Sequence, residues 1–420
     1  MLKTDPFDIL RLIYTMGPLS RTDLAQQLNI ALSLVGPVIR KALDGGYLIE
    51  DGFRPSKGGR RPILLRINPA FGKLVGVDIG RSHIRFVVTD FAGKVVTRKL
   101  LPTDILKGKD RVLQVVHQEL QAQIAKSPDV AAIGIAHSGV IDPQHGSVLF
   151  WPMVEGWENT PLRQIVEDAH KLPTFVVGDS VRAMAVTEER FGQGKGLRSF
   201  VLVYLGRGIG SALYLDGHLL TGRDGLAGEL GHTTVEENGD LCSCGNRGCL
   251  ELCSSAAAVV RRVRSELERG ISSSLTSLIG GNLDQLSVET IVNAARDHDR
   301  LAERIMSEAG MRLGTALAGV VNLLNPEKVI LTGKMPQVAG EIILEPLLYN
   351  LRQRALPRAV RDLPVVVSEF GEEAAAVGMA LVAGEGLLKA GCLEMQKGNE
   401  ARVNGGELSE GSVPPASPEM

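Results

Sequence analysis

The sequence shows no long apolar run and no pattern typical of an export leader. Among its 420 residues no uninterrupted apolar segment approaches the roughly 20 residues that a membrane-spanning helix needs. The opening residues, MLKTDPFDIL, show no basic region followed by an apolar core, so they predict no secretory signal. We therefore expect a cytoplasmic protein without membrane insertion.

Cysteine and net charge are also scarce. Four of the five cysteines fall within residues 242–253, which fits a reducing compartment. The net charge of −2 argues against a protein that is basic throughout. However, residues 1–70 carry ten Lys and Arg against six Asp and Glu, a net of +4 that leaves −6 for the remainder. A small basic module on an acidic body is expected when one end of a chain meets nucleic acid.

The most informative segment is GELGHTTVEENGDLCSCGNRGCLE, which places His232, Cys242, Cys244 and Cys249 within eighteen residues. Zn²⁺ takes four nitrogen or sulfur ligands in tetrahedral geometry, and one histidine with three cysteines is a standard closed set. Three nearby glycines let the backbone turn tightly enough for such ligands to converge. The segment therefore predicts a structural zinc site.

Two other interpretations of these cysteines stay open, namely buried apolar residues or a disulfide. We expect Cys253 to be a buried residue rather than a ligand, and Cys392 lies far along the chain. Glu229 and Glu251 bracket the cluster. Carboxylates at the rim of a metal-supported loop are good acceptors for the hydroxyl groups of a sugar.

The first 70 residues predict a winged helix-turn-helix domain. Apolar residues recur at helical spacing over 6–16, Ser20 is a candidate N-cap for a helix over 21–28, and a third helix passes through 38–43. Two short apolar segments at 47–49 and 63–67 then flank a polar turn, as in a hairpin.

This layout predicts DNA binding. The hairpin tip carries four cations suited to phosphates or a minor groove, with a solvated basic loop as the alternative: Arg54, Lys57, Arg60 and Arg61. In the third helix, Ser33, Arg40 and Lys41 are the candidates for contact with bases. Pro37 is tolerable there if Ser33 is the N-cap. Because this region is unusually apolar, we expect weak base reading or a larger contribution from the wing.

The remainder predicts a mixed α/β architecture. Expected strands cover 74–80, 83–89, 94–99, 130–135, 174–177, 200–204 and 329–331, and expected helices cover 110–125, 300–324 and 372–388. The tail from about residue 396 is rich in Gly, Ser, Pro and Glu, a composition typical of disorder.

With these features in place, the chain resembles the ROK family of repressors, open reading frames and kinases over about residues 6–390. The most specific motifs are GELGH followed by CSCGNRGCLE, together with the segment VYLGRGIGSALYLDGHLLTGRDGLAGELGH. The opening module with GGRRPILLRINP resembles the repressor branch, since kinase-only members lack it. The resemblance implies an actin-like ATPase (ribonuclease H-like) fold, with two α/β lobes around a ligand cleft behind a winged helix.

The resemblance also sets the expected domain boundaries. These are a winged helix-turn-helix domain at 1–70, a small lobe at 71–190, a large lobe with the zinc loop at 191–371, a returning helix at 372–392 and a disordered tail at 393–420.

By resemblance, the sugar-binding residues are Gly139, Asp179, Glu229, His232 and Glu251. The family's histidine both ligates zinc and lies against the sugar. Asp179 matches the base that deprotonates the attacking sugar hydroxyl in the family's kinases. Gly178 and Val181 stand where the family often has asparagine, which predicts an altered sugar preference or weaker sugar binding.

The nucleotide side departs further from the kinases of this family. The three loops that hold phosphate and adenosine carry Arg81, Arg207 and Lys334 where the kinases have small residues. Such loops work because small residues let backbone N–H groups close around phosphate. The three departures predict lost ATP use, although these cations can also be interpreted as phosphate ligands.

These observations support one leading hypothesis and two alternatives. The leading one is a transcriptional regulator, expected to be a homodimer or tetramer, that binds an operator and senses a sugar or sugar phosphate without kinase activity. The alternatives are an ATP-dependent kinase of a hexose or N-acetylhexosamine with a fused DNA-binding module, and an interaction protein that uses the body as a scaffold. The presence of Glu229, His232 and Glu251 argues against the scaffold.

Overall fold

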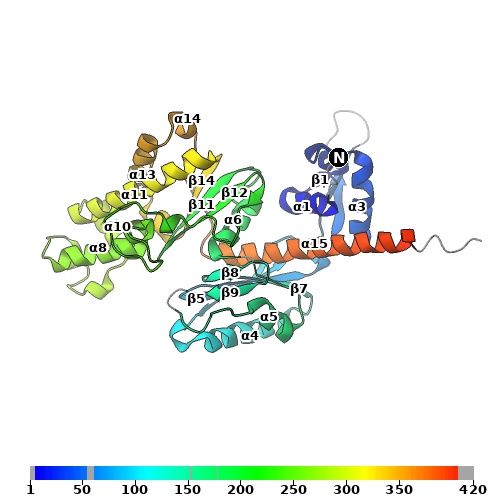
Figure 1. Cartoon of the computed structure of the whole chain (residues 1–420), viewed down its shortest axis with the longest axis horizontal. Coiled ribbons are helices and arrows are strands. Elements are labelled where there is room, and N and C mark those ends of the chain that lie inside the picture. The colour runs from blue at the N-terminus through cyan, green and yellow to red at the C-terminus, as the bar shows by residue number, and fades with distance from the viewer. Residues whose placement is uncertain (1–4, 54–60, 152–153, 177, 405–420) are drawn as a thin grey trace, which may run out of the picture. The chain divides into compact units, whose positions relative to one another are not determined.

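The computed structural model describes residues 5–53, 61–151, 154–176 and 178–404, with side chains up to residue 391. It divides into two compact units (Figure 1), one formed by Met1–Phe71 with Gly384–Met420 and the other by Gly72–Ala383. The predicted winged-helix domain therefore includes a C-terminal segment that the sequence assigned to a returning helix and a tail.

The N-terminal part of the first unit has the predicted winged-helix order. Its elements are α1 (Pro6–Met16), β1 (Leu19–Ser20), α2 (Arg21–Gln27), α3 (Leu32–Asp44), β2 (Leu48–Phe53) and β3 (Ile63–Ile67). The strands form an antiparallel sheet in the order β1-β3-β2. Ser20 caps α2 as predicted, because its hydroxyl accepts from Asp23 N–H while the Asp23 carboxylate accepts from Ser20 N–H.

Helix α3 corrects the prediction at its start. The helix begins at Leu32 after Ala31, so Ser33 lies inside the first turn and makes no N-cap hydrogen bond. Pro37 is consequently the sixth helical residue rather than part of the first turn. The helix tolerates it because Val35, Ile39 and Ala42 are completely buried and hold this face against the core.

The last helix, α15 (Ala374–Asn404), contributes its second half to the first unit. Arg11 pairs with Glu385 at 2.8 Å, and the Lys389 ammonium lies 5.8 Å from the centre of the Phe7 ring. The predicted disordered tail at 393–420 is thus wrong for 393–404, which are helical. The rest of that prediction lies outside the described residues.

The second unit contains two five-stranded sheets with the same strand order. In the first sheet, β4 (Lys73–Ile79) pairs antiparallel with β5 (His83–Asp90), which pairs with β6 (Val95–Pro102). On its other side β4 runs parallel to β7 (Val130–His137), which runs parallel to β10 (Thr174–Val176).

The second sheet repeats this pattern. Strand β11 (Phe200–Leu205) pairs antiparallel with β12 (Ile209–Leu215), which pairs with β13 (His218–Leu219). On its other side β11 runs parallel to β14 (Lys328–Thr332), which runs parallel to β15 (Val365–Val367). Two lobes of equal topology are the expected actin-like fold, and helices cover both sheets.

The remaining elements connect and cover these sheets (Figure 1). They are α4 (Lys109–Lys126), β8 (Val140–Asp142), β9 (Ser147–Phe150), α5 (Leu162–His170), α6 (Ser180–Phe191), α7 (Leu250–Ser254), α8 (Ala256–Glu268), α9 (Leu275–Leu278), α10 (Val288–Arg296), α11 (Arg300–Leu324), α12 (Lys334–Ala339), α13 (Glu341–Arg354) and α14 (Pro357–Val360). Short 3₁₀ turns occupy Pro69–Phe71, Ile105–Lys107, Leu230–His232 and Leu283–Gln285.

The first half of α15 packs closely on the first sheet. A Cβ atom at Gly76 in β4 would lie 1.8 Å from the carbonyl oxygen of Ala376, and one at Gly134 in β7 would lie 1.9 Å from that of Met379. Only glycine allows this approach between backbones. The apolar stretch Ala374–Gly391 is long enough to cross a membrane, but 67% of it is buried inside the protein, as in a core helix.

Candidate functional site

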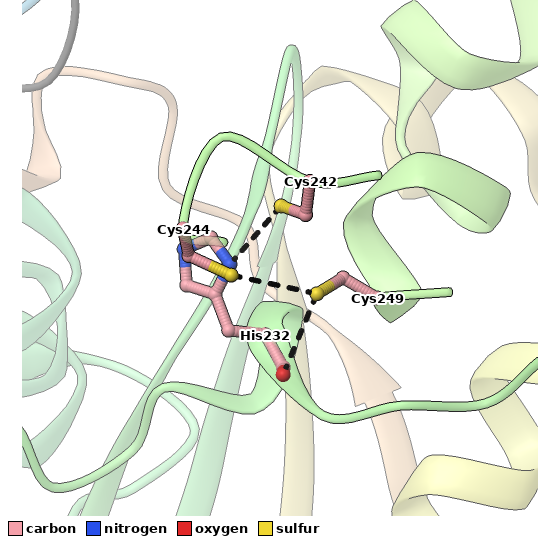
Figure 2. A group of neighbouring side chains, drawn as sticks. All are labelled: His232, Cys242, Cys244 and Cys249. Atoms are coloured by element: carbon pink, nitrogen blue, oxygen red, sulfur yellow. Dashed lines mark hydrogen bonds between the residues drawn. The ribbon is translucent and has the colours of Figure 1, made fainter. Parts of the chain in front are cut away.

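The four predicted metal ligands converge. Their ligand atoms all lie within 4.8 Å of one another, and Figure 2 shows the three sulfur atoms and the imidazole ring of His232 turned towards one another. His232 ends the 3₁₀ turn Leu230–His232, Cys242 and Cys244 lie in the following loop, and Cys249 directly precedes α7. Segments up to seventeen residues apart are thereby joined at one point.

The spacing of these atoms fits a tetrahedral zinc ion. A Zn–S bond of about 2.3 Å and a Zn–N bond of about 2.0–2.1 Å place two sulfurs roughly 3.8 Å apart and a sulfur and a nitrogen roughly 3.6 Å apart. Cys244 Sγ lies 3.7 Å from Cys249 Sγ, and Cys242 Sγ lies 3.6 Å from His232 Nδ1. A disulfide bond is about 2.0 Å long, so the Cys244–Cys249 pair is not bridged.

The fourth thiol of this segment is separate. Cys253 is buried and lies outside the group, and its thiol donates to the Glu236 carboxylate at 3.5 Å. Burial raises the pKa of the Cys253 thiol, which keeps it neutral. The side chain of Cys392 lies outside the described residues.

Three of the predicted sugar ligands lie near one another and beside His232. Burial raises the pKa of Glu229, the charge of Asp179 raises it further, and Glu251 adds to the effect, whereas His232 and Arg182 oppose it. Glu251, in the first turn of α7, accepts a hydrogen bond from Ile209 N–H at 3.0 Å. The carboxylates are therefore held by separate segments around one small region.

The carboxylate of Asp179 is already engaged by its own helix. Asp179 is the N-cap of α6, where one oxygen accepts from the N–H groups of Val181 and Arg182 at 2.8 and 2.9 Å. Its other oxygen pairs with Arg182 Nη1 at 3.0 Å. Arg182 is only 4% exposed, and its Nη2 donates to the Ala227 carbonyl at 2.6 Å. The sequence interpretation missed Arg182, although a cation three residues after a candidate base is visible in the sequence.

Gly139 makes contacts within its own loop. Its N–H donates to Nδ1 of His137 at 2.9 Å, and His137 is completely buried between Trp151 and Trp157. Burial lowers the pKa of His137 to about 3, so the imidazole is neutral and Nδ1 remains an acceptor. His137 was not singled out from the sequence, and its signal is a histidine at the end of an otherwise apolar strand.

On the predicted nucleotide side, protein side chains occupy the first loop. The buried carboxylate of Asp78 accepts from the Ser180 hydroxyl at 2.5 Å and from Arg85 Nη1 at 3.3 Å, and Arg85 also pairs with Glu372. Burial raises the pKa of Asp78. Arg85 thus places a cation against the carboxylate of Asp78, near the end of β4.

Tyr204 lies between the other two loops. A Cβ atom at Gly206 would lie 2.2 Å from the Tyr204 hydroxyl oxygen, and one at Gly333 would lie 3.0 Å from the Tyr204 ring. Burial raises the pKa of this phenol to about 12. Among the three cations predicted to obstruct phosphate, Arg81 and Arg207 are exposed and Lys334 pairs with Glu289. Tyr204 and Arg85 thus pack beside these loops, which the sequence interpretation did not reveal.

The predicted DNA-contacting residues are only partly described. Ser33 and Arg40 are exposed on α3, and Lys41 is half-buried. Arg61 is exposed just before β3, whereas Arg54, Lys57 and Arg60 lie outside the described residues.

A separate cavity of about 270 Å³ lies against β6 and α4 and contains none of the predicted site residues.

The sequence profile of the ROK family matches residues 74–385. The chain belongs to the ROK family. It is 30% identical over 374 residues to the xylose repressor of Caldicellulosiruptor bescii, an alignment that covers 88% of this chain and 92% of that protein.

Two further relatives of this ROK protein differ in how much of the chain they match. The crystal structure of a ROK family transcriptional regulator, a homologue of the Escherichia coli MLC protein, superposes with a TM-score of 0.78 at 29% identity and covers 93% of this chain and 97% of its own. The glucokinase of Thermotoga maritima is 34% identical over 310 residues, which cover 74% of this chain and 96% of that enzyme.

Proposed function

We propose that this ROK protein is a transcriptional regulator that binds an operator through its winged-helix unit and responds to a sugar or sugar derivative in the cytoplasm. The observation that carries the proposal is the winged helix attached to a ROK body. The regulator structure matches nearly the whole chain, whereas the glucokinase alignment leaves a quarter of it unmatched. Homologues named as repressors support the same conclusion.

The proposed effector site uses the residues around the metal cluster. Glu229 and Glu251 would accept hydroxyl groups of the ligand, with His232 between ligand and metal and Gly139 at a neighbouring loop. His232, Cys242, Cys244 and Cys249 would hold Zn²⁺, which when bound supplies a rigid structural crosslink. Effector binding changes operator affinity only if the ligand binds the two conformations of the protein with different affinities.

A kinase is the second candidate, because Asp179 is present at the position of the family's base. Two features weigh against it. Arg182 pairs with the Asp179 carboxylate at 3.0 Å, so a sugar hydroxyl would have to compete with this ion pair for the same oxygen. Tyr204 lies against two of the loops that hold nucleotide in the family's kinases, and Arg85 pairs with Asp78 at the third, contacts that we propose to limit nucleotide binding. The regulator that we propose is a dimer, which presents two winged helices to a two-fold operator.

The test combines DNA binding and turnover. Fluorescence anisotropy with duplexes from the gene's own upstream region, at low salt, is expected to detect binding that one member of a panel of hexoses, pentoses, N-acetylhexosamines and their phosphates changes at least fivefold. A coupled ATPase assay with the same panel is expected to give no turnover above that of Asp179→Asn. Absence of DNA binding, or sugar-dependent ATP hydrolysis that Asp179→Asn abolishes, would overturn the proposal.

A further inference from the structure

Helix α3 presents apolar side chains on its outer face. Val35, Ile39 and Ala42 are completely buried, so the side of the helix opposite to them faces outwards. Ser33, Pro37 and Arg40 lie on that outer side at helical spacing, and all three are exposed. Leu34 lies at the edge of this face, one turn before Pro37, and is 52% exposed.

The exposed side chains divide into two groups along the helix. The N-terminal half carries Leu32, Leu34 and Pro37, with Ser33 as the one exposed hydrogen-bonding side chain of this half. The following turn carries Arg40 and Lys41. In helix-turn-helix proteins the N-terminal residues of the recognition helix contact base edges. The residues in the base-reading position are thus mainly apolar, and cations follow them.

The major groove offers one apolar group to such a surface. Each base pair presents hydrogen-bond donors and acceptors there, and only thymine adds a methyl group, which apolar side chains contact. We infer that Leu34 and Pro37 recognise thymine methyl groups, so that this helix selects A·T pairs by apolar contact rather than by paired hydrogen bonds. The inference rests on the proposed DNA binding and specifies how the sequence is read.

Charge favours DNA over a protein partner on this face. Residues 1–70 carry a net charge of +4 while the remainder of the chain carries −6. Arg40 lies on the same face as Pro37, at a spacing of three residues, where it can meet a phosphate as the apolar side chains enter the groove. A surface built to bind a second copy of this chain would have no need of exposed cations in the turn that follows its apolar side chains.

The test replaces thymine with deoxyuridine, which removes only the methyl group. The full-length protein first selects duplexes from a random-sequence pool, and the enriched site is then synthesised with deoxyuridine at one thymine position at a time. We expect one or two positions per half-site at which the substitution raises Kd about three- to fivefold, the effect of losing one buried methyl group. Leu34→Ala is expected to bind the thymine and deoxyuridine forms equally at one of these positions.

Leu278→Ala is the matched control, because Leu278 in α9 is similarly exposed at 58%. This variant should keep the wild-type ratio between the two duplexes, and thermal melting should be unchanged in both variants. If a site is enriched but no thymine methyl matters, or if Leu34→Ala keeps the wild-type ratio at every position, the inference is wrong while the proposed function stands. If the pool yields no enriched sequence, sequence-specific DNA binding itself fails.

Discussion

At the scale of single residues, the candidate site combines side chains with fixed hydrogen-bond partners and an exposed loop that carries two of the proposed metal ligands. The buried imidazole of His137 and the engaged carboxylates of Asp78 and Asp179 leave little freedom in the surrounding segments. The loop that carries Cys242 and Cys244 is different, because most of its side chains are exposed and Val235 is its main contact with the hydrophobic core. Its order is therefore expected to depend on the bound ion.

Replacing one proposed metal ligand tests this dependence. Cys244→Ala removes an exposed thiol, so the fold of the lobe should persist while the metal is lost and residues 232–251 become disordered. Metal analysis of the wild type is expected to give about one zinc per chain, and hydrogen exchange should rise only in this loop. Cys253→Ala is the matched control, because that thiol lies outside the group and should leave the metal content unchanged.

The second residue-scale prediction concerns pH. The pKa of His137 is about 3 in the folded protein and near 6.5 when it is unfolded, so the unfolded chain binds an additional proton between these values. Stability from neutral His137 is complete above about pH 6.5 and falls with acidification, by on the order of 1 kcal/mol per pH unit. His137→Asn keeps an acceptor for Gly139 N–H but does not titrate. The free energy of unfolding, measured with urea between about pH 7 and about pH 5, should therefore fall more steeply on acidification in the wild type than in His137→Asn.

The two tryptophans of the chain make this measurement specific. Trp151 and Trp157 are the only tryptophans in the sequence, and both rings lie within 4.5 Å of the His137 ring centre. Their fluorescence therefore reports unfolding at this place in the second unit. Equal slopes for wild type and His137→Asn would show that His137 is not the titrating group.

At the scale of elements, local signals decided which boundaries could be predicted. Helix α11 was predicted to the residue, because the Asp299 side chain caps its first turn and Asn325 ends it in a left-handed conformation. The start of α3 was not, because Ser33 offers a capping hydroxyl and Pro37 favours a helix that starts just before it, whereas the helix begins at Leu32. Burial of Val35 and Ile39 overrides that signal, and burial is a property of the folded unit.

In the candidate site too, local sequence signals decided which features could be predicted. The convergence of the four proposed metal ligands could be predicted, because they share one short segment and their chemistry is specific. The roles of Arg182 and Tyr204 could not, since their contacts depend on segments far away in the sequence. Arg182 meets Ala227, 45 residues later, and Tyr204 lies against Gly333. Such pairings are set by the strand order of two sheets rather than by local pattern.

The capping box of α2 gives an element-scale prediction. Ser20→Ala removes a buried hydroxyl that accepts from Asp23 N–H, and the loss of such a cap costs about 1 kcal/mol. Hydrogen exchange over residues 20–28 should accelerate about fivefold. Ser33→Ala is the control, because the exposed Ser33 makes no cap hydrogen bond, and its exchange should match the wild type. Equal protection in the two variants would count against the assigned cap.

At the scale of the whole molecule, the DNA-binding unit is discontinuous in sequence. Residues 384–391 supply Glu385 to Arg11 and Lys389 to Phe7, and Gly391 lies directly against the Tyr47 hydroxyl. The segment 1–71 alone therefore lacks part of its own packing surface. The sequence analysis assigned the helix expected at 372–392 to the ROK body alone. That assignment came from the family resemblance, which gave no sign of contacts with the winged helix.

Truncation tests this organisation. A chain that ends after residue 383 should lose DNA binding at least tenfold and show early melting of the first unit, while its zinc content and effector binding persist. A chain that ends after residue 404 keeps the described helix and should bind DNA as the full chain does. Thermal melting and anisotropy measure both effects. Undiminished DNA binding after removal of 384–420 would contradict the assignment of this segment to the first unit.

Helix α15 also determines when the protein can finish folding during synthesis. Ala376 and Met379 of this helix pack against the glycines of β4 and β7, and its Glu385 and Lys389 contact the winged-helix unit. Ribosomes add about 5–20 residues per second, so the strands made first wait on the order of ten seconds or more for the helix that covers them. Until then both units of the nascent chain expose apolar surface. We therefore expect chaperone dependence to be highest late in translation and to end only when the last helix emerges.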